Sequence, residues 1–398
     1  MWIRRSYKVE LDISNKQRTL LKKHAGVARF AFNWGLARRI DEYRSTGQSS
    51  NAIEQHKQLN AVKRAQFPWM YEVSKCAPQE SLRDLDRAFK HFFRRCKAGD
   101  SNPGFPRFKN KKRGSGGFRL TGRFSVESRR IKLPRIGWLR LRESGYVPTD
   151  AKIDCVTVKE RAGRWFISVQ VQELRAVSMN HGPAIGLDVG LSSLVVGSDG
   201  SRLPPPKPLV RSLKRLQRLA RRCANKRIGS ANRRKSASKL AKLHYRVACQ
   251  RSDVLHKATT RLAKTKSVIV VETLNVSGML KNRSLARGIA DASWSELVRQ
   301  LTYKCEWYGS RLVKADRFFP STKTCSGCGT VKDAVPLSER VYCCDGCGLV
   351  IDRDLNAAKN LLKLATASSV GRGPRPKACG DRLFGRSEKQ EPSSASMQ

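Results

Sequence analysis

The spacing of apolar residues along the chain changes between two periods. Apolar and polar residues alternate over 2–12 and again over 124–174, which predicts β-strands. The break at Arg161-Ala162-Gly163 indicates a hairpin turn between two of these strands. We therefore expect a small β-domain over residues 1–12 and 103–180. The alternation is clearest at Val156, Val158, Trp165, Ile167, Val169 and Val171.

Helical spacing interrupts these strands and predicts a helical insert over residues 13–102. A start signal at Ser14-Asn15 opens the first helix, and a polar break spans 45–52. A further helix over 79–96 has aromatic residues on one face, which favour a packed core over base stacking. The apolar positions are Leu21, Ala25, Ala28, Phe32, Leu36 and Ile40, then Leu82, Leu85, Phe89, Phe92 and Cys96.

The second half of the chain has the pattern of an α/β domain. After a linker at 181–183, residues 184–187 predict a buried strand that ends in Asp188, and residues 194–196 predict its return strand. The apolar run Val268–Val271 is typical of a central parallel strand, and Glu272 stands at its carboxyl end, where α/β folds place reactive groups. A helix follows with Trp294, Leu297, Leu301 and Tyr308 on one face, and then a strand over 311–317.

An acidic residue on the first strand of such a sheet is typical of ribonuclease H-like nucleases. It is also typical of sugar kinases and actin-like ATPases. An actin-like ATPase would need a second glycine-rich phosphate loop, which the sequence lacks.

The segment over 207–264 is strongly basic. Two apolar stripes separated near Gly229-Ser230 predict a helical hairpin with Lys and Arg on its outer faces. The stripes are Leu209, Leu213, Leu216 and Ala220, then Leu240, Leu243, Val247, Val254, Ala258 and Leu262. The whole chain has 80 Lys and Arg against 32 Asp and Glu, a formal net charge of +48. This charge indicates a nucleic-acid partner and steeply salt-dependent binding.

Particular basic residues are candidates for nucleic-acid contact. The loop over 103–118 interleaves Phe105, Phe108 and Phe118 with basic residues, which suits backbone contact plus stacking, although a solvated loop is the alternative. The candidates are Arg107, Lys109, Lys111 and Lys112 in this loop, with Arg215 and Arg222 on the hairpin. No run of 18 apolar residues occurs, so we expect no membrane span.

Cysteine spacing predicts a structural zinc site. Cys325-x-x-Cys328 and Cys344-x-x-Cys347 form two turns that each aim two sulfurs at one point, which gives the tetrahedral thiolate set that Zn²⁺ prefers. Cys343 could replace Cys344, but only Cys344 keeps the two-residue spacing to Cys347. Disulfides are the alternative, and the N-terminus carries no secretory signal that would favour them.

A third acidic residue, Asp354, starts a predicted helix with Ala357, Ala358, Leu361 and Leu362 on one face. Alone it would be an ordinary helix cap. Together with Asp188 and Glu272 it suggests a carboxylate site, because three converging carboxylates repel each other unless divalent cations lie between them. Beyond residue 364 periodicity ends, and we expect residues 367–398 to be disordered.

The chain resembles the TnpB (OrfB) proteins of insertion sequences, relatives of type V CRISPR effectors. The likeness covers nearly the whole chain up to about residue 365. Many relatives have an acid directly after the catalytic glutamate, whereas Thr273 follows Glu272 here. Besides the Glu272 strand, the likeness rests on ARFAFNWGLAR, LRDLDRAFKHFFRRCKAG, PGFPRFK, IGLDVG, SWSELVRQLTYKCEWYG, STKTCSGCG and IDRDLNAAKNL.

The resemblance implies a multidomain α+β fold. Its parts would be a wedge-like β-barrel (1–12 and 103–180), a helical recognition insert (13–102), a RuvC-like, ribonuclease H-like domain (183–322 and 351–366) and a zinc ribbon (323–350). It also implies an RNA-guided DNA endonuclease of a transposable element. Two Mg²⁺ ions would be held by Asp188, Glu272 and Asp354, and Gln79 would lie near the short motif beside the target.

The implied partners are a guide RNA and a double-stranded DNA target. We expect a monomer in a prokaryotic-type cytoplasm, associated with the nucleoid. Two alternatives stay open: a nuclease-silent relative that represses by RNA-guided binding, and a DNA-joining transposase. The intact acids count against the first, and the absence of a tyrosine or serine recombinase pattern counts against the second.

Overall fold

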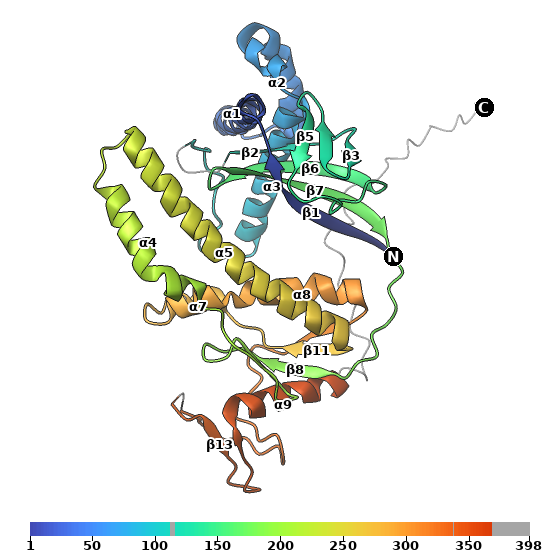
Figure 1. Ribbon diagram of the computed structural model, residues 1–398, viewed down its shortest axis with the longest axis vertical. Coiled ribbons are helices and arrows are strands. Elements are labelled where there is room, and N and C mark those ends of the chain that lie inside the picture. Colours follow the sequence, from blue (N-terminus) through green and yellow to red (C-terminus); the bar gives the residue numbers. More distant parts are fainter. Residues whose placement is uncertain (112–115, 337, 368–398) are drawn as a thin grey trace, which may run out of the picture.

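The N-terminal half is built on one antiparallel sheet. Figure 1 shows the computed structural model, which describes residues 1–111, 116–336 and 338–367. The strands of this sheet lie in the order β2-β6-β7-β1-β5-β4-β3. Their bounds are β1 (Trp2–Asp12), β2 (Gly117–Leu120), β3 (Ser125–Glu127), β4 (Arg130–Leu133), β5 (Gly137–Leu141), β6 (Lys152–Arg161) and β7 (Arg164–Leu174).

The predicted hairpin is present, but the closed barrel is not. Ala162 and Gly163 both have positive φ, 52° and 79°, which makes the tight turn between β6 and β7. Residues from both ends of the sheet, such as Phe118 and Ile131, share one core. Within the described residues, however, the edge strands β2 and β3 do not pair with each other, so the sheet stays open.

The helical insert contains one more helix than the sequence predicted. Its elements are α1 (Asn15–Thr46), α2 (Ala52–Gln66), the short 3₁₀ helix η1 (Pro68–Glu72) and α3 (Cys76–Lys97). Ser14 caps α1 as expected, with a reciprocal bond to Gln17. The prediction missed α2, which buries Gln55, Leu59 and Lys63 rather than an apolar stripe. Cys96 is exposed, so its assignment to the buried face of α3 was wrong.

A second, mixed sheet organises the C-terminal half. Its order is β10-β9-β8-β11-β12, with β8, β11 and β12 parallel and β9 and β10 antiparallel. The predicted central strand is therefore confirmed as β11. The bounds are β8 (Ile185–Asp188), β9 (Val195–Gly197), β10 (Arg202–Leu203), β11 (Val268–Val271) and β12 (Arg311–Lys314).

Helices cover both faces of this sheet (Figure 1). Ile269 and Val271 pack with residues of α5 (Ala231–Thr265) and α8 (Trp294–Tyr308). Val270 points the other way, toward Leu361 of α9 (Arg353–Ala367). Two short helices, α6 (Val276–Met279) and α7 (Ala286–Ala292), lie between β11 and α8 in sequence.

The basic hairpin consists of α4 (Pro208–Ala224) and α5, as predicted. The buried face of α5 continues through Leu255, Thr259 and Ala263, one residue later than the predicted Val254, Ala258 and Leu262. Ala220, predicted in the apolar stripe of α4, is exposed.

Asp291 of α7 fixes the base of this hairpin. Its buried carboxylate accepts hydrogen bonds from the Leu209 backbone N–H (3.1 Å) and from Arg251 Nη2 (2.9 Å). It thereby joins the first turn of α4 to α5 and to the segment that follows β11. None of these contacts was visible in the spacing of apolar residues.

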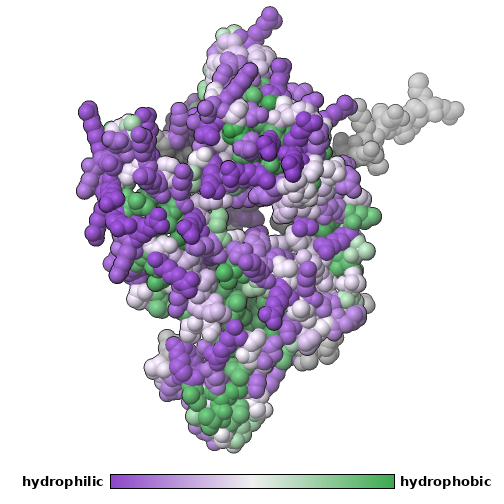
Figure 2. Space-filling model, viewed as in Figure 1, coloured by the Kyte–Doolittle hydropathy of each residue, from purple (hydrophilic) through white to green (hydrophobic). Residues whose placement is uncertain are grey.

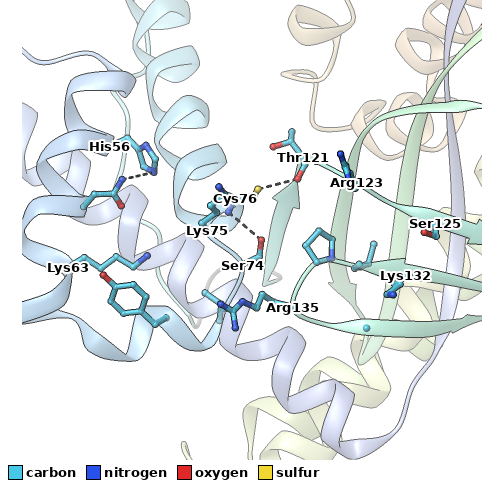
Figure 3. A pocket seen from close by; sticks show the side chains of 17 residues that line it. His56, Lys63, Ser74, Lys75, Cys76, Thr121, Arg123, Ser125, Lys132 and Arg135 are labelled. Atoms are coloured by element: carbon cyan, nitrogen blue, oxygen red, sulfur yellow. Dashed lines mark hydrogen bonds between the residues drawn. The ribbon is translucent and has the colours of Figure 1, made fainter.

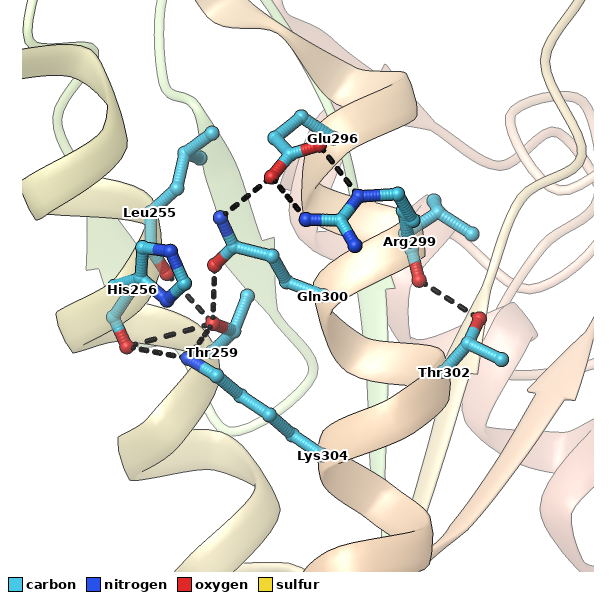
Figure 4. Close-up of polar contacts among 9 residues, drawn as sticks. Leu255, His256, Thr259, Glu296, Arg299, Gln300, Thr302 and Lys304 are labelled. Carbon is cyan, nitrogen blue, oxygen red and sulfur yellow. Dashed lines mark hydrogen bonds and ion pairs between the residues drawn. The ribbon is translucent and has the colours of Figure 1, made fainter. Parts of the chain in front are cut away.

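A polar cluster explains the shifted face of α5 (Figure 4). Lys304 of α8 is buried, and its ammonium donates to the His256 carbonyl (2.8 Å) and the hydroxyls of Thr259 (2.7 Å) and Thr260 (2.8 Å). Thr259 also donates to Gln300 Oε1 at 2.9 Å. Burial lowers the pKa of Lys304 to about 8. The interface between α5 and α8 thus combines apolar residues such as Leu255 and Leu301 with these polar partners, which the spacing of apolar residues did not indicate.

The segment before α9 forms a two-stranded ribbon of β13 (Val341–Cys343) and β14 (Val350–Asp352). The tail was predicted to be disordered, and its residues beyond 367 lie outside the described part of the chain. Within the described residues, no helix is long and apolar enough to cross a membrane.

Candidate active site and metal centre

The four predicted cysteines meet in the ribbon. Cys325 Sγ lies 3.7 Å from Cys347 Sγ, and Cys328 Sγ lies 3.6 Å from Cys344 Sγ. Four sulfurs at the usual zinc bond length of about 2.3 Å would be roughly 3.8 Å apart in a tetrahedron. All four ligand atoms lie within 4.8 Å of one another, and Cys343 is not among them. The donor set therefore fits Zn²⁺, and it contains Cys344 rather than Cys343.

Hydrogen bonds to the sulfurs favour the thiolate form. The Gly327 backbone N–H donates to Cys325 Sγ at 3.3 Å. The hydroxyl and backbone of Thr330 lower the pKa of Cys328 to about 6. Zinc binds the thiolate, so these bonds favour metal binding at Cys325 and Cys328, whereas contacts with the neighbouring cysteine sulfurs raise the pKa of Cys347 to about 11.

Two buried asparagines join the ribbon to α9. Asn356 accepts from the Ser326 N–H (2.8 Å) and donates to the Thr324 carbonyl (2.7 Å). Asn360, one turn later, donates to the Ser321 carbonyl at 2.9 Å. The sequence analysis saw only the Ala and Leu face of this helix. The i, i+4 spacing of two asparagines within an apolar run was the signal that it missed.

The sheet places Asp188 and Glu272 side by side. Leu187 of β8 pairs with Val271 of the parallel strand β11, so Asp188 and Glu272 are the next residues in register. Leu187 and Val271 face α5 and α8. Because side chains alternate along a strand, Asp188 and Glu272 both point to the opposite face, which α9 covers.

Close packing between β8 and α9 completes the arrangement. A Cβ atom at Gly186 would lie 2.1 Å from the Ala358 carbonyl oxygen and 2.5 Å from the Leu362 backbone nitrogen. The helix therefore rests directly on the strand backbone, two residues before Asp188. Only glycine permits this approach.

Asp354 lies in the first turn of α9 but does not cap it. The cap is Asp352, whose Oδ1 accepts from the Leu355 backbone N–H at 3.0 Å and whose Oδ2 pairs with Arg202 at 2.9 Å. Arg353 Nη2 lies 3.5 Å from Asp354 Oδ1. The helix-cap role thus belongs to Asp352, and among the described residues Asp354 makes no capping bond that would account for its carboxylate.

The charges of Glu272 and Asp354 both act on Asp188. Burial, followed by the charges of Glu272 and Asp354, raises the pKa of Asp188 to about 8. Burial also raises the pKa of Glu272. The acids are not as tightly gathered as the cysteines, which form the one set of potential metal ligands found within 4.8 Å among the described residues.

Glu272 is held from one side only. Ser321 donates its hydroxyl proton to Glu272 Oε1 at 2.8 Å. The hydroxyl of Thr273 donates instead to the Ala315 carbonyl at 2.7 Å, next to the end of β12. The residue that departs from the family pattern therefore bonds to the backbone of the neighbouring segment rather than to Glu272.

The predicted nucleic-acid contacts differ in their surroundings. Arg107, Lys111, Arg215 and Arg222 are exposed, whereas Gln79 is half-buried in the first turn of α3. The Lys109 ammonium lies 3.7 Å from the centre of the Phe32 ring, and burial lowers its pKa. Phe118 is buried in the core of the β-domain, so its stacking role was wrong. Lys112 lies outside the described residues.

A cleft lies between the helical insert and the β-domain (Figure 3). Its volume is about 1030 Å³, and His56, Lys63 and Lys75 line one side. Arg123, Lys132 and Arg135 line the other side, so cations face the cleft from both parts. Figure 2 shows that hydrophilic residues also dominate the visible outer surface of the α4–α5 hairpin, whereas an apolar patch marks the ribbon. Its exposed residues include Val331, Val341 and Val350.

Comparisons with known proteins agree with this geometry. A protein of Streptomyces pristinaespiralis named "Putative RNA-guided DNA endonuclease" is 36% identical over 399 residues, which cover 99% of this chain and 97% of that protein. Residues 166–283 match the family model OrfB_IS605, described as "Probable transposase". The chain belongs to the TnpB (OrfB) family.

Other matches extend over the remaining parts of this TnpB-family chain. Residues 294–361, which include the four clustered cysteines, match the model "Cas12f1-like, TNB domain", and residues 1–48 match "Helix-turn-helix domain". In the structure the latter residues form β1 and α1. An Escherichia coli K12 relative, "Putative RNA-guided DNA endonuclease InsQ", is 32% identical and is covered over 97% of both chains.

A solved structure shares the fold of this TnpB-family chain. It is titled "Cryo-EM structure of the Cas12f1-sgRNA-target DNA complex" and aligns with a TM-score of 0.55 at 12% identity, over 91% of this chain and 99% of the other. The fold is accordingly a Cas12-like multidomain α/β fold, in agreement with the coarse prediction.

Proposed function

We propose that this protein is an RNA-guided DNA endonuclease of a transposable element, and that Asp188, Glu272 and Asp354 form its catalytic site. One observation carries the assignment of the site. Carboxylates from β8, β11 and α9 face one region, where burial and mutual repulsion raise the pKa of Asp188 to about 8. Such crowding is unfavourable in the absence of a cation, and carboxylate oxygens are the donors that Mg²⁺ prefers.

The donor set fits two Mg²⁺ ions bound by the three acids. When bound, such ions would supply an activated water and stabilise the charge on the leaving 3′ oxygen. The chain prepares this chemistry in three ways. Ser321 donates a hydrogen bond that orients Glu272. Asp352 caps α9, so the carboxylate of Asp354 is available to bind a cation. Asp188 holds a proton that cation binding would displace.

The cationic surfaces are the binding sites for nucleic acid in this proposal. We assign the guide RNA and the target DNA to the exposed outer faces of α4 and α5 and to the cleft between insert and β-domain. Helix α4 contains no acid and α5 contains one, Asp253, which pairs with Lys257 at 2.8 Å. A protein that delegates sequence readout to base pairing needs such backbone contacts. Gln79 stays assigned to the vicinity of the adjacent motif.

The domain scheme follows from the same proposal. The open sheet of β1 to β7 is the wedge-like domain, α1 to α3 form the recognition insert, and the mixed sheet with α9 is RuvC-like. The cysteine ribbon holds structural Zn²⁺ and, through Asn356 and Asn360, supports the helix that carries Asp354. We propose that the protein acts as a monomer on nucleoid DNA.

The test is cleavage of a matched DNA target by the purified protein–RNA complex in Mg²⁺. Asp188→Ala, Glu272→Gln and Asp354→Ala should each lower the rate by orders of magnitude while target binding persists. Glu306→Ala, which removes an exposed acid on α8 outside the surfaces assigned to nucleic acid, is the matched control. A wild type that binds the target without cutting would support the repressor alternative. Undiminished cleavage by Asp354→Ala would transfer the third role to Asp352.

A further inference from the structure

The aromatic side chain of Phe318 is exposed to solvent. It is 84% exposed, whereas the next most exposed aromatic side chain in the described part of the chain, Trp2, reaches 68%. Burying a phenylalanine typically contributes about 1.5–3 kcal/mol to stability, a contribution that Phe318 does not make. A role in the fold therefore does not account for the ring.

A hydrogen-bonded turn holds Phe318 in this position. The Phe318 backbone N–H donates to Asp316 Oδ1 at 2.9 Å, and the Ser321 N–H donates to the Phe319 carbonyl at 2.8 Å. The side chain of Phe319 points inward and packs with the core that contains Val270 and Leu361. Two adjacent phenylalanines thus point in opposite directions, one into the domain and one away from it.

The same turn reaches the candidate catalytic site. Ser321, three residues after Phe318, donates to Glu272 Oε1. Glu272, Arg317, Phe318 and Lys323 all line one pocket of about 380 Å³. The Arg317 guanidinium lies 5.6 Å from the centre of the Phe318 ring. An exposed ring and a cation therefore lie at the rim of the pocket that contains Glu272.

We propose that Phe318 is a stacking platform for an unpaired base of the DNA strand that enters the catalytic site, and that Arg317 contacts a phosphate of that strand. The inference rests on the proposed nuclease function. Unpaired bases expose flat faces that stack on aromatic rings without regard to sequence, and a neighbouring guanidinium neutralises the backbone. Because the turn also holds Glu272, a stacked base would set the position of the strand relative to that carboxylate.

Binding is measured with a single-stranded oligonucleotide that contains 2-aminopurine, whose fluorescence falls when the base stacks. The protein–RNA complex carries Glu272→Gln, so that the strand stays intact. Phe318→Ala should weaken binding roughly 5- to 150-fold and abolish the fluorescence loss, because stacking on an aromatic side chain is worth about that factor. Phe318→Trp should restore both.

Two controls separate stacking from other effects. Phe318→Leu keeps an apolar side chain without a flat ring and should behave like the alanine variant. Tyr43→Ala removes another exposed ring, on α1, and should leave binding and fluorescence unchanged. All of these variants should melt at the wild-type temperature, because neither ring is buried.

Cleavage distinguishes this inference from the proposed function. In protein that keeps the native Glu272, Phe318→Ala should raise the KM for cleavage more than it lowers kcat. If the wild type cuts and Phe318→Ala binds, quenches and cuts equally well, the platform is refuted while the nuclease stands. If the wild type never cuts, the nuclease proposal fails, and an unchanged fluorescence in Phe318→Ala would refute the platform as well.

Discussion

Asp188→Asn should stabilise the Mg²⁺-free protein, and increasingly so as pH rises. In the folded state the pKa of Asp188 is about 8, whereas the ordinary value for aspartate is 3.8. Folding therefore raises the affinity of this group for its proton. The resulting stability is fully present below pH 3.8 and is lost as pH rises through about 8.

The magnitude follows from proton counting. Between these two pKa values the folded state holds about one more proton than the unfolded state, so the unfolding free energy falls by about 1.4 kcal/mol per pH unit. From pH 5 to pH 7 the wild type should lose about 2.7 kcal/mol relative to Asp188→Asn. Titration of all other groups is common to both proteins and cancels in the difference.

Hydrogen exchange of the β8 and β11 amides measures this difference for the relevant sheet, independently of the other domains. The buffers should lack Mg²⁺ but leave zinc in place. Added Mg²⁺ should then raise protection in the wild type more than in the variant. If the two proteins keep a constant difference from pH 5 to pH 7 without Mg²⁺, Asp188 is ionised in the folded state and the argument from crowded carboxylates fails.

Three further predictions concern the zinc ligands, the basic hairpin and its base. Cys344→Ser should lose the zinc that elemental analysis finds in the wild type, at about one ion per chain, whereas Cys343→Ser should retain it; the reverse order would show that the ligand was misassigned. Nucleic-acid affinity should fall linearly in a log–log plot against salt, and Arg215→Ala should reduce the slope by about one; an unchanged slope would remove this residue from the interface. Asp291→Ala leaves Arg251 without its buried partner and should destabilise the base of the hairpin by about 3–5 kcal/mol, seen as faster proteolysis within α4 and α5; wild-type resistance would contradict that role.

The sequence predicted the parts of the site whose chemistry forces a spacing. Cys-x-x-Cys turns admit few geometries, and acids that follow buried strands are recognisable because the strands are apolar. Thus Asp188 and Glu272 could each be placed at the end of a buried strand, whereas the pairing of these two strands is a finding of the structure. Their catalytic role stays a prediction.

Features that depend on tertiary partners could not be predicted in the same way. Helix α2 buries Gln55 and Lys63, which resemble solvent-facing residues in a hydropathy pattern. Lys304 of α8 bonds to three acceptors on α5, and these bonds turn Thr259 toward α8. A hydropathy pattern along α5 alone does not contain that partner. Lys109, which was expected to face nucleic acid, is exposed, and its ammonium also lies 3.7 Å from the centre of the Phe32 ring, a contact between distant parts of the chain that no local pattern indicates.

A substitution at Gly186 could abolish cleavage while Asp188, Glu272 and Asp354 all remain in the sequence. Any side chain at that position would act as a spacer between β8 and α9, and would move the helix that carries Asp354 away from the strand that carries Asp188. The width of the proposed catalytic site is therefore set by a residue that has no reactive side chain. A copy of the element with a larger residue at position 186 would keep its guide and target surfaces, and we expect it to evolve from a cutting protein into one that only binds.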